Sequence, residues 1–172
     1  PVEWLWRDYV TAGSVVTIAG APQSGKTTLA SLIAVARAST TGPCKVLGRE
    51  VTPAPPNQRI ILIAERGEVS TAKSLVQAAE LLGLDDGALD RILVFARKPL
   101  LVGDNCEWRQ VEKLIEKGCI SDIFIDTIDV NGDKDQLSLV TAVAAALETA
   151  PSGRSTTAWL LTHRCKDSPL QP

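Results

Sequence analysis

The sequence predicts an α/β fold of three layers, α/β/α, around a mostly parallel sheet. Five short apolar runs alternate along the chain with segments of helical spacing, which is the order expected of parallel strands joined by crossover helices. A glycine-rich loop also joins the first apolar run directly to the first helical segment, in GAPQSGKTTLA (20–30). A length of 172 residues suits one domain with its own core, so we expect a single domain over residues 1–172.

Each strand of this sheet is expected at an apolar run. Strands are predicted at residues 14–19 (SVVTIA), 59–64 (RIILIA), 91–96 (RILVFA), 122–126 (DIFID) and 158–162 (AWLLT). The runs do not alternate strictly between apolar and polar residues, so we expect both faces of each strand to be buried.

Helices are predicted between these strands, at residues 25–38, 68–83, 107–118 and 135–150. Gly83 and Gly118 are suitable helix ends, and Pro151 follows the last segment. The proline-rich stretch TPAPPNQ (52–58) predicts a surface loop between two elements.

Composition excludes several classes of protein. No run approaches the roughly 18 apolar residues that span a bilayer, and no signal segment opens the chain, so we expect a cytoplasmic protein without a membrane partner. The four cysteines show no CxxC pairing, which argues against a zinc site. A net charge of −2 means that any nucleic-acid contact would be local. The chain begins at Pro1 and contains no methionine, so we expect a fragment or a processed product rather than an intact reading frame.

The glycine-rich loop matches the phosphate-binding signature G-x-x-x-x-G-K-[ST], the Walker A motif. Its backbone N–H groups would cradle the phosphates of ATP at the start of a helix. Lys26 would reach the β- and γ-phosphates as a catalytic cation, and Thr27 would offer its hydroxyl to Mg²⁺. A glycine-rich turn without a ligand is the alternative. The expected nucleotide-binding residues are Gly20, Ala21, Pro22, Gln23, Ser24, Gly25, Lys26, Thr27 and Thr28.

An acidic residue at a strand end is the second requirement for Mg²⁺. In DIFID, three apolar residues lead into Asp126, which fits the Walker B pattern and predicts a second metal residue. Asp122 and Asp129 are weaker candidates for the same role. An ordinary strand that ends in a solvated aspartate is the alternative.

Thr127 follows Asp126, where many ATPases carry a water-orienting glutamate. The carboxylate must then come from another strand. Glu65 follows the second apolar run directly, so it is expected at the edge of the sheet where ligands bind, and it is the candidate catalytic base. A salt bridge to Arg66 is the alternative role. Glu68 is the runner-up, although we expect it in the first turn of a helix, where its negative charge suits the helix dipole.

His163 is the only histidine and follows the fifth apolar run. A neutral imidazole there could donate a hydrogen bond to the γ-phosphate and lose that partner after hydrolysis, which would make His163 a catalytic sensor. A structural histidine is the alternative. Arg164 and Lys166 follow it and could face phosphate, DNA or solvent.

These motifs resemble the RecA-like ATPases, and within them the RepA-type hexameric replicative helicases of plasmids, phages and mobile elements. The residues that carry the resemblance are Glu65, Asp126–Thr127 and the segment THRCK at 162–166, where Thr162 stands in place of the family's first histidine. The lead-in VEWLWRDYVTAGSVVTIAG and the spacer TTGPCKVLGREV are also similar to that family.

The resemblance implies a P-loop NTPase fold with a RecA-like sheet, in which the strand of His163 lies between the Walker A and Walker B strands. It also implies a homo-oligomeric ring, usually of six subunits, with ATP at the subunit interfaces and single-stranded DNA in the centre. The family's arginine finger lies beyond the segment at 162–166, and Arg154 is a possible local substitute.

Three other functions remain open from the sequence. A regulatory or partitioning ATPase with a protein partner fits the net charge of −2. A nucleotide or small-molecule kinase fits less well, because residues 126–155 contain only Lys134 and Arg154 as cations. A module that binds nucleotide without hydrolysis is the last.

Trp4, Trp6 and Tyr9 could stack on adenine or a DNA base, or be buried against the sheet.

Overall fold

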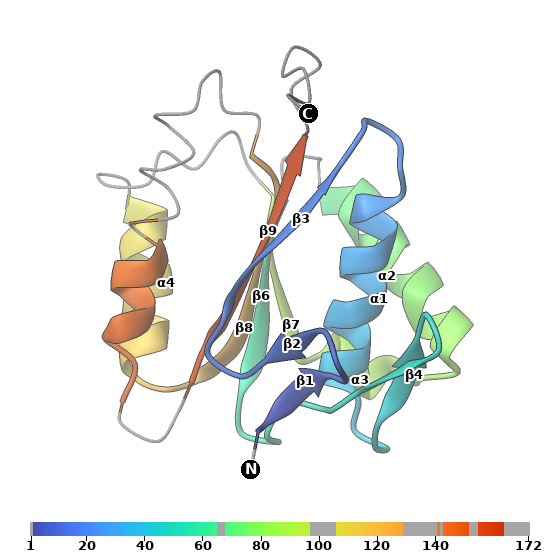
Figure 1. Cartoon of the computed structure of the whole chain (residues 1–172), viewed down its shortest axis with the longest axis horizontal. Helices are drawn as coiled ribbons and strands as arrows, with labels where there is room; N and C mark the ends of the chain where they lie inside the picture. The colour runs from blue at the N-terminus through green and yellow to red at the C-terminus, as the bar shows by residue number, and fades with distance from the viewer. Residues whose placement is uncertain are drawn as a thin grey trace, which may run out of the picture.

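The computed structural model describes residues 2–64, 68–96, 106–128, 141, 143–151 and 155–163, and its centre is a sheet of five parallel strands (Figure 1). The strand order is β3-β9-β8-β6-β7. The bounds of these strands are β3 Val15–Gly20, β9 Thr157–His163, β8 Ile120–Ile128, β6 Arg59–Ala64 and β7 Ile92–Ala96. The expected parallel sheet is confirmed.

Strand β9 lies between β3 and β8. Gly20 at the end of β3 pairs with His163 at the end of β9, and Ala64 at the end of β6 pairs with Asp126 on β8. The carboxyl ends of these four strands therefore share one edge of the sheet. The position that the family resemblance implied for the strand of His163 is confirmed.

Helices cover both faces of the sheet (Figure 1). On one face lie α1 (Lys26–Ala38), α2 (Glu68–Leu82) and α3 (Asp86–Leu89), and on the other lie α4 (Cys106–Glu116) and the helical residues 143–148. Ile60 and Leu62 of β6 belong to the buried cluster that contains Ile33 of α1. Ile61 and Ile63 of the same strand belong to the opposite cluster, which contains residues of α4. Successive side chains thus enter different cores, which explains why β6 is apolar from Ile60 to Ala64. The expectation that both faces of each strand are buried is wrong for β3, an edge strand in which exposed and half-buried residues alternate.

Most boundaries agree with the expected ones, but β8 extends beyond the predicted range of 122–126 at both ends. The polar residues Ser121 and Asp122 belong to this strand and are buried. Apolar periodicity does not detect such residues, because their burial depends on partners elsewhere in the chain. Of the helix predicted at 135–150, residues 141 and 143–148 are helical, and 135–140 lie outside the described part. The short α3 was not predicted.

A second, antiparallel sheet was also not predicted. Its order is β2-β1-β5-β4, with bounds β2 Val10–Thr11, β1 Trp4–Trp6, β5 Arg49–Val51 and β4 Cys44–Val46. Leu47 and Gly48 form the tight turn between β4 and β5, with φ of 49° and 76°. Positive φ at both central residues is the geometry that matches the twist of a hairpin. Figure 1 places this sheet near the end where the strands of the large sheet begin.

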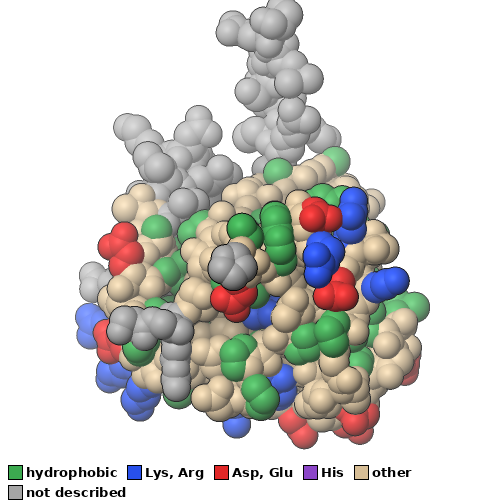
Figure 2. Space-filling view, turned by 60° about the horizontal axis from the view of Figure 1, so that its bottom comes forward, with side chains coloured by type: hydrophobic (Ala, Val, Ile, Leu, Met, Phe, Trp, Pro, Cys, Tyr) green, Lys and Arg blue, Asp and Glu red, His purple; other side chains and the backbone are tan. Residues whose placement is uncertain are grey.

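The tryptophan-rich lead-in belongs to this small sheet. Trp6 is buried, donates its indole N–H to the carbonyl of Val46 at 3.2 Å, and lies 4.5 Å from the ring of Tyr9. The face turned forward in Figure 2 carries acidic, basic and apolar side chains intermixed. Arg49–Asp8 and Arg7–Glu50 are exposed ion pairs of this sheet. Trp6 therefore serves the packing of the small sheet, as expected of a buried cluster, and not stacking on adenine or a DNA base.

Candidate functional site

The loop that matches the phosphate-binding signature leaves β3 at Gly20 and enters α1 at Lys26. Its residues 21–25 are exposed. Gly25 stands at the N-cap of α1 with φ of 85°, a conformation that glycine adopts with little strain. At Gly20 the requirement is space, since a Cβ there would lie 2.7 Å from the hydroxyl of Ser24. Gln23 also has a left-handed φ of 61°, so the loop curls tightly in front of the helix.

Lys26 lies inside this curl. Its side chain is 8% exposed, and its ammonium donates hydrogen bonds to the carbonyls of Gly20 at 3.0 Å and Ala21 at 2.7 Å. Thr27, in the same first turn, is half-buried, and Thr28 is exposed. The structure thus brings the cation and the hydroxyl-bearing residue to the loop where the sequence predicted them.

Asp126 lies on β8 near the same edge of the sheet and is 7% exposed. Its backbone is in register with Ala64, the last residue of β6, and Glu65 is the next residue in the sequence. Glu65 itself lies outside the described residues, as do Arg66 and Asp129. The expectation that Asp122 could serve as a rival metal residue is wrong, because its carboxylate is fully buried against Arg37 at the start of β8.

His163 ends β9, and its backbone is paired with Gly20 at the start of the phosphate loop. Its side chain lies outside the described part of the structure, and so do Arg154, Arg164 and Lys166. Thr127 is described only through its backbone within β8. The roles expected of these side chains remain predictions.

Sequence reasoning missed a buried polar network near the start of these strands. Arg37 of α1, Asp122 of β8 and Trp159 of β9 are joined by hydrogen bonds and are all nearly inaccessible to solvent. An arginine within the apolar stretch AVARA and an aspartate before IFI are the sequence signals that could have indicated it. Nearby, burial and then the charge of Arg37 hold the pKa of Arg91 below its usual value.

The described residues suit a magnesium ion that is bound together with a nucleotide. They do not suit a metal ion that is held by protein ligands alone. Among them there is no group of three or more His, Cys, Asp or Glu residues that could hold a metal. Magnesium bound with a nucleotide needs only one or two protein groups, since phosphates and water complete its shell. Thr27 and Asp126 supply a hydroxyl and a carboxylate for the metal ion, and the loop that begins at Gly20 would hold the phosphates.

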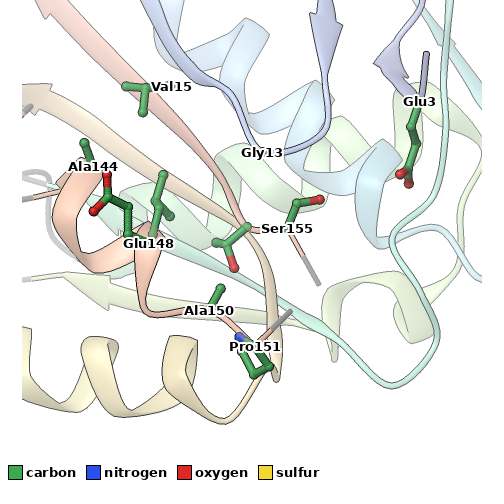
Figure 3. Close-up of a pocket in the computed structure, with 10 residues that line it drawn as sticks. Glu3, Gly13, Val15, Ala144, Glu148, Ala150, Pro151 and Ser155 are labelled. Carbon is green, nitrogen blue, oxygen red and sulfur yellow. The ribbon is translucent and has the colours of Figure 1, made fainter. Parts of the chain in front are cut away.

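A cavity of about 630 Å³ lies elsewhere, beside the beginning of β3 (Figure 3). It is lined by the start of β3 and by the segment that leads from the helical residues 143–148 to β9, and it includes the carboxylates of Glu3 and Glu148. None of its lining residues comes from the phosphate loop or is Asp126. This cavity is therefore separate from the candidate nucleotide site, the exposed loop at the carboxyl edge. Over the described ranges, no helix has the length and apolar character needed to cross a membrane.

A comparison with protein families decides the relationship. A family model named AAA_25 and described as an AAA domain matches residues 1–169. The chain belongs to this AAA domain family. A search of curated proteins finds no match to this AAA domain.

Solved structures agree with this assignment at the level of the fold. The crystal structure of the RadB recombinase, one of 189 matching chains, aligns with a TM-score of 0.58 and 20% sequence identity. The alignment covers 93% of this chain and 66% of RadB, which is less than two thirds of that protein. The AAA domain therefore has a RecA-like P-loop ATPase fold, as predicted. The narrower resemblance to RepA-type helicases stays a prediction.

Proposed function

We propose that this AAA domain binds ATP with Mg²⁺ and hydrolyses it to drive a DNA-associated motor of the RepA-type replicative helicase kind. The observation that carries the proposal is the strand order β3-β9-β8. It gathers the phosphate loop, the strand that ends in His163 and the strand that carries Asp126 at one edge of the sheet. Open α/β sheets bind their ligands at this edge.

Each described residue of the site has a role that its position supports. The backbone of residues 20–28 would hold the phosphates at the start of α1, where the helix dipole favours negative charge. Lys26 would exchange its two loop carbonyls for β- and γ-phosphate oxygens. Thr27 and Asp126 would hold Mg²⁺, directly and through water. The metal would supply neutralisation of the phosphate charge.

Two further roles rest on the sequence. Glu65, which follows the end of β6, would orient the attacking water as a general base. His163, which ends β9, would donate to the γ-phosphate and report its loss. The proposed partners of the domain are single-stranded DNA and further copies of the chain in a six-membered ring. The proposed location is the cytoplasm, and the family resemblance implies the ring and the DNA. An arginine from a neighbouring copy, or Arg154, would complete the site.

The test is steady-state ATP hydrolysis with and without single-stranded DNA, with Lys26→Ala as the blank. A motor of this kind should show DNA-stimulated turnover that disappears in the variant. Turnover that DNA does not change would favour the second candidate, a regulatory or partitioning ATPase with a protein partner. The net charge of −2 and the sequence pI near 5.5 support that second candidate. Nucleotide binding without turnover would indicate an arginine finger that must be supplied in trans, or a module that only binds nucleotide.

Two glycine variants test the phosphate loop. Gly25 and Gly48 have left-handed φ of 85° and 76°, and a Cβ at either would meet nothing within 4 Å. Alanine at each should therefore lower the free energy of unfolding similarly, by about 1–2 kcal/mol, as measured by urea denaturation. Only Gly25→Ala is expected to weaken the binding of a fluorescent ADP analogue, because Gly48 lies in the turn of the small sheet. Equal affinities in the two variants would contradict the proposed role of the loop.

A further inference from the structure

A buried ion pair connects the phosphate-loop helix to the central sheet. Arg37, in the last turn of α1, places both Nε and Nη2 at 2.9 Å from Oδ2 of Asp122 on β8. Its Nη1 donates to the carbonyl of Thr52. The side chains of Arg37 and Asp122 are 3% and 0% exposed. A pair so completely removed from water is tolerated only when its geometry is good, so it holds α1 at a defined place on β8.

The other oxygen of the same carboxylate reaches a third element. Asp122 Oδ1 accepts a hydrogen bond of 3.0 Å from the indole N–H of Trp159 on β9. The ring of Trp159 is stacked on Phe124 of β8, with centroids 5.1 Å apart and planes at 7°. One carboxylate therefore fixes α1, β8 and β9 relative to one another.

These three elements are also the ones that carry the candidate site. Thr27 lies about 15 Å from Arg37 along α1. Asp126 lies about 13 Å from Asp122 along β8, and His163 lies about the same distance from Trp159 along β9. A helix and two paired strands are stiff over such lengths, so their arrangement at the buried pair also sets their arrangement at the site.

We propose that Arg37 is a positioning residue for the metal-nucleotide site. By way of Asp122 and Trp159 it sets the place of α1 against β8 and β9, and so the separation between Thr27 and Asp126. This inference rests on the proposed function. Its direct consequence concerns the metal, because the two candidate metal residues stand on two of the elements that Arg37 joins. Binding of phosphate by the loop alone involves only β3 and α1, and depends less on Arg37.

Arg91 provides a matched control. It also holds the end of α1, donating from Nη1 to the carbonyls of Ala38 at 3.1 Å and Ser39 at 3.2 Å. Its Nη2 donates to three carbonyls of the proline-rich segment 52–58, those of Ala54, Pro55 and Gln58. Within the described ranges these hydrogen bonds involve no atom of β8 or β9. Lysine at either position removes a guanidinium fork but keeps a cation, and only Arg37→Lys disturbs the link to the two strands.

The experiment measures the affinity of the full chain for a fluorescent ADP analogue in Mg²⁺ and in EDTA. The ratio of the two dissociation constants is the magnesium gain. We expect Arg37→Lys to reduce this gain about 10-fold, the lower end of the range for residues that orient metal ligands, while the affinity in EDTA stays within about threefold. Arg91→Lys should keep the gain of the wild type. Circular dichroism at the assay temperature establishes that each variant is folded.

A second pair of variants serves if Arg37→Lys does not fold. Trp159→Phe removes the N–H that binds Asp122 and keeps an aromatic ring against Phe124. Trp6→Phe is its control, since Trp6 is also a buried tryptophan that donates its indole N–H, but within the small sheet. Trp159→Phe should reduce the magnesium gain and Trp6→Phe should not.

The outcomes separate this inference from the proposed function. A normal gain in Arg37→Lys, or in Trp159→Phe where that variant carries the test, would overturn the positioning role and leave the proposed function standing. Equal losses in a variant and its control would also overturn it, because they would indicate a general effect on stability. A wild-type protein without any magnesium gain would contradict the proposed metal site itself, and the positioning role with it.

Discussion

Replacing Lys26 by alanine is expected to lower ATP turnover by about 10²–10³-fold, the range found when one preorganised electrostatic group is removed from an active site. The ammonium is 8% exposed and lies within the phosphate loop, on the carbonyls of Gly20 and Ala21. A charge held in this position needs little rearrangement to meet the charge that develops on the phosphates. Phosphate release in the steady state, with Mg²⁺ and excess ATP, measures the effect.

Lys45→Ala is the control for this variant. Lys45 is exposed on β4 of the small sheet, away from the loop, so its removal should leave turnover within about twofold, as expected of a surface position without such a feature. Substantial turnover in Lys26→Ala would mean that the phosphate loop is not where hydrolysis occurs. The same two variants in the ADP-binding assay would separate a loss of affinity from a loss of chemistry.

Replacing Arg37 by methionine is expected to lower the free energy of unfolding by about 3–5 kcal/mol, the range for removing one partner of a buried ion pair. The loss is large because Asp122 would keep a buried charge that only the indole N–H of Trp159 still contacts among its described partners. Urea denaturation followed by circular dichroism measures it. Many domains have a total stability of only about 5–15 kcal/mol, so the variant should be markedly less resistant to urea.

An exposed ion pair gives the comparison. Arg49 and Asp8 lie 2.7 Å apart, closer than Arg37 and Asp122, but their side chains are 49% and 53% exposed. Arg49→Met should therefore change the stability by no more than about 1 kcal/mol. If both methionine variants lost similar stability, burial would not be the reason for the effect, and the account of the network around Asp122 would be wrong.

The sequence by itself determined the local parts of this AAA domain. The phosphate loop could be predicted because its function depends on neighbours in the chain. Glycine is needed at Gly25 for a left-handed φ and at Gly20 for space, and a lysine must begin the helix. The inner strands of the large sheet could be predicted because both of their faces are buried, so each forms a short, continuous apolar run. The edge strand β3 is also an apolar run, although one of its faces is exposed. Their alternation with helices was enough to predict the three layers.

Only the tertiary structure decided what depends on residues far apart in the chain. The small sheet pairs Trp6 with Val51, and a strand of three residues carries too little periodicity to be predicted alone. The strand order, which places β9 beside β3, follows from packing in three dimensions, and before the structure only the family resemblance implied it. Asp122 looked like a possible metal residue, because the sequence does not show that Arg37, 85 residues away, neutralises it inside the core. A charge acquires its role from its surroundings, and those surroundings exist only once the chain has folded.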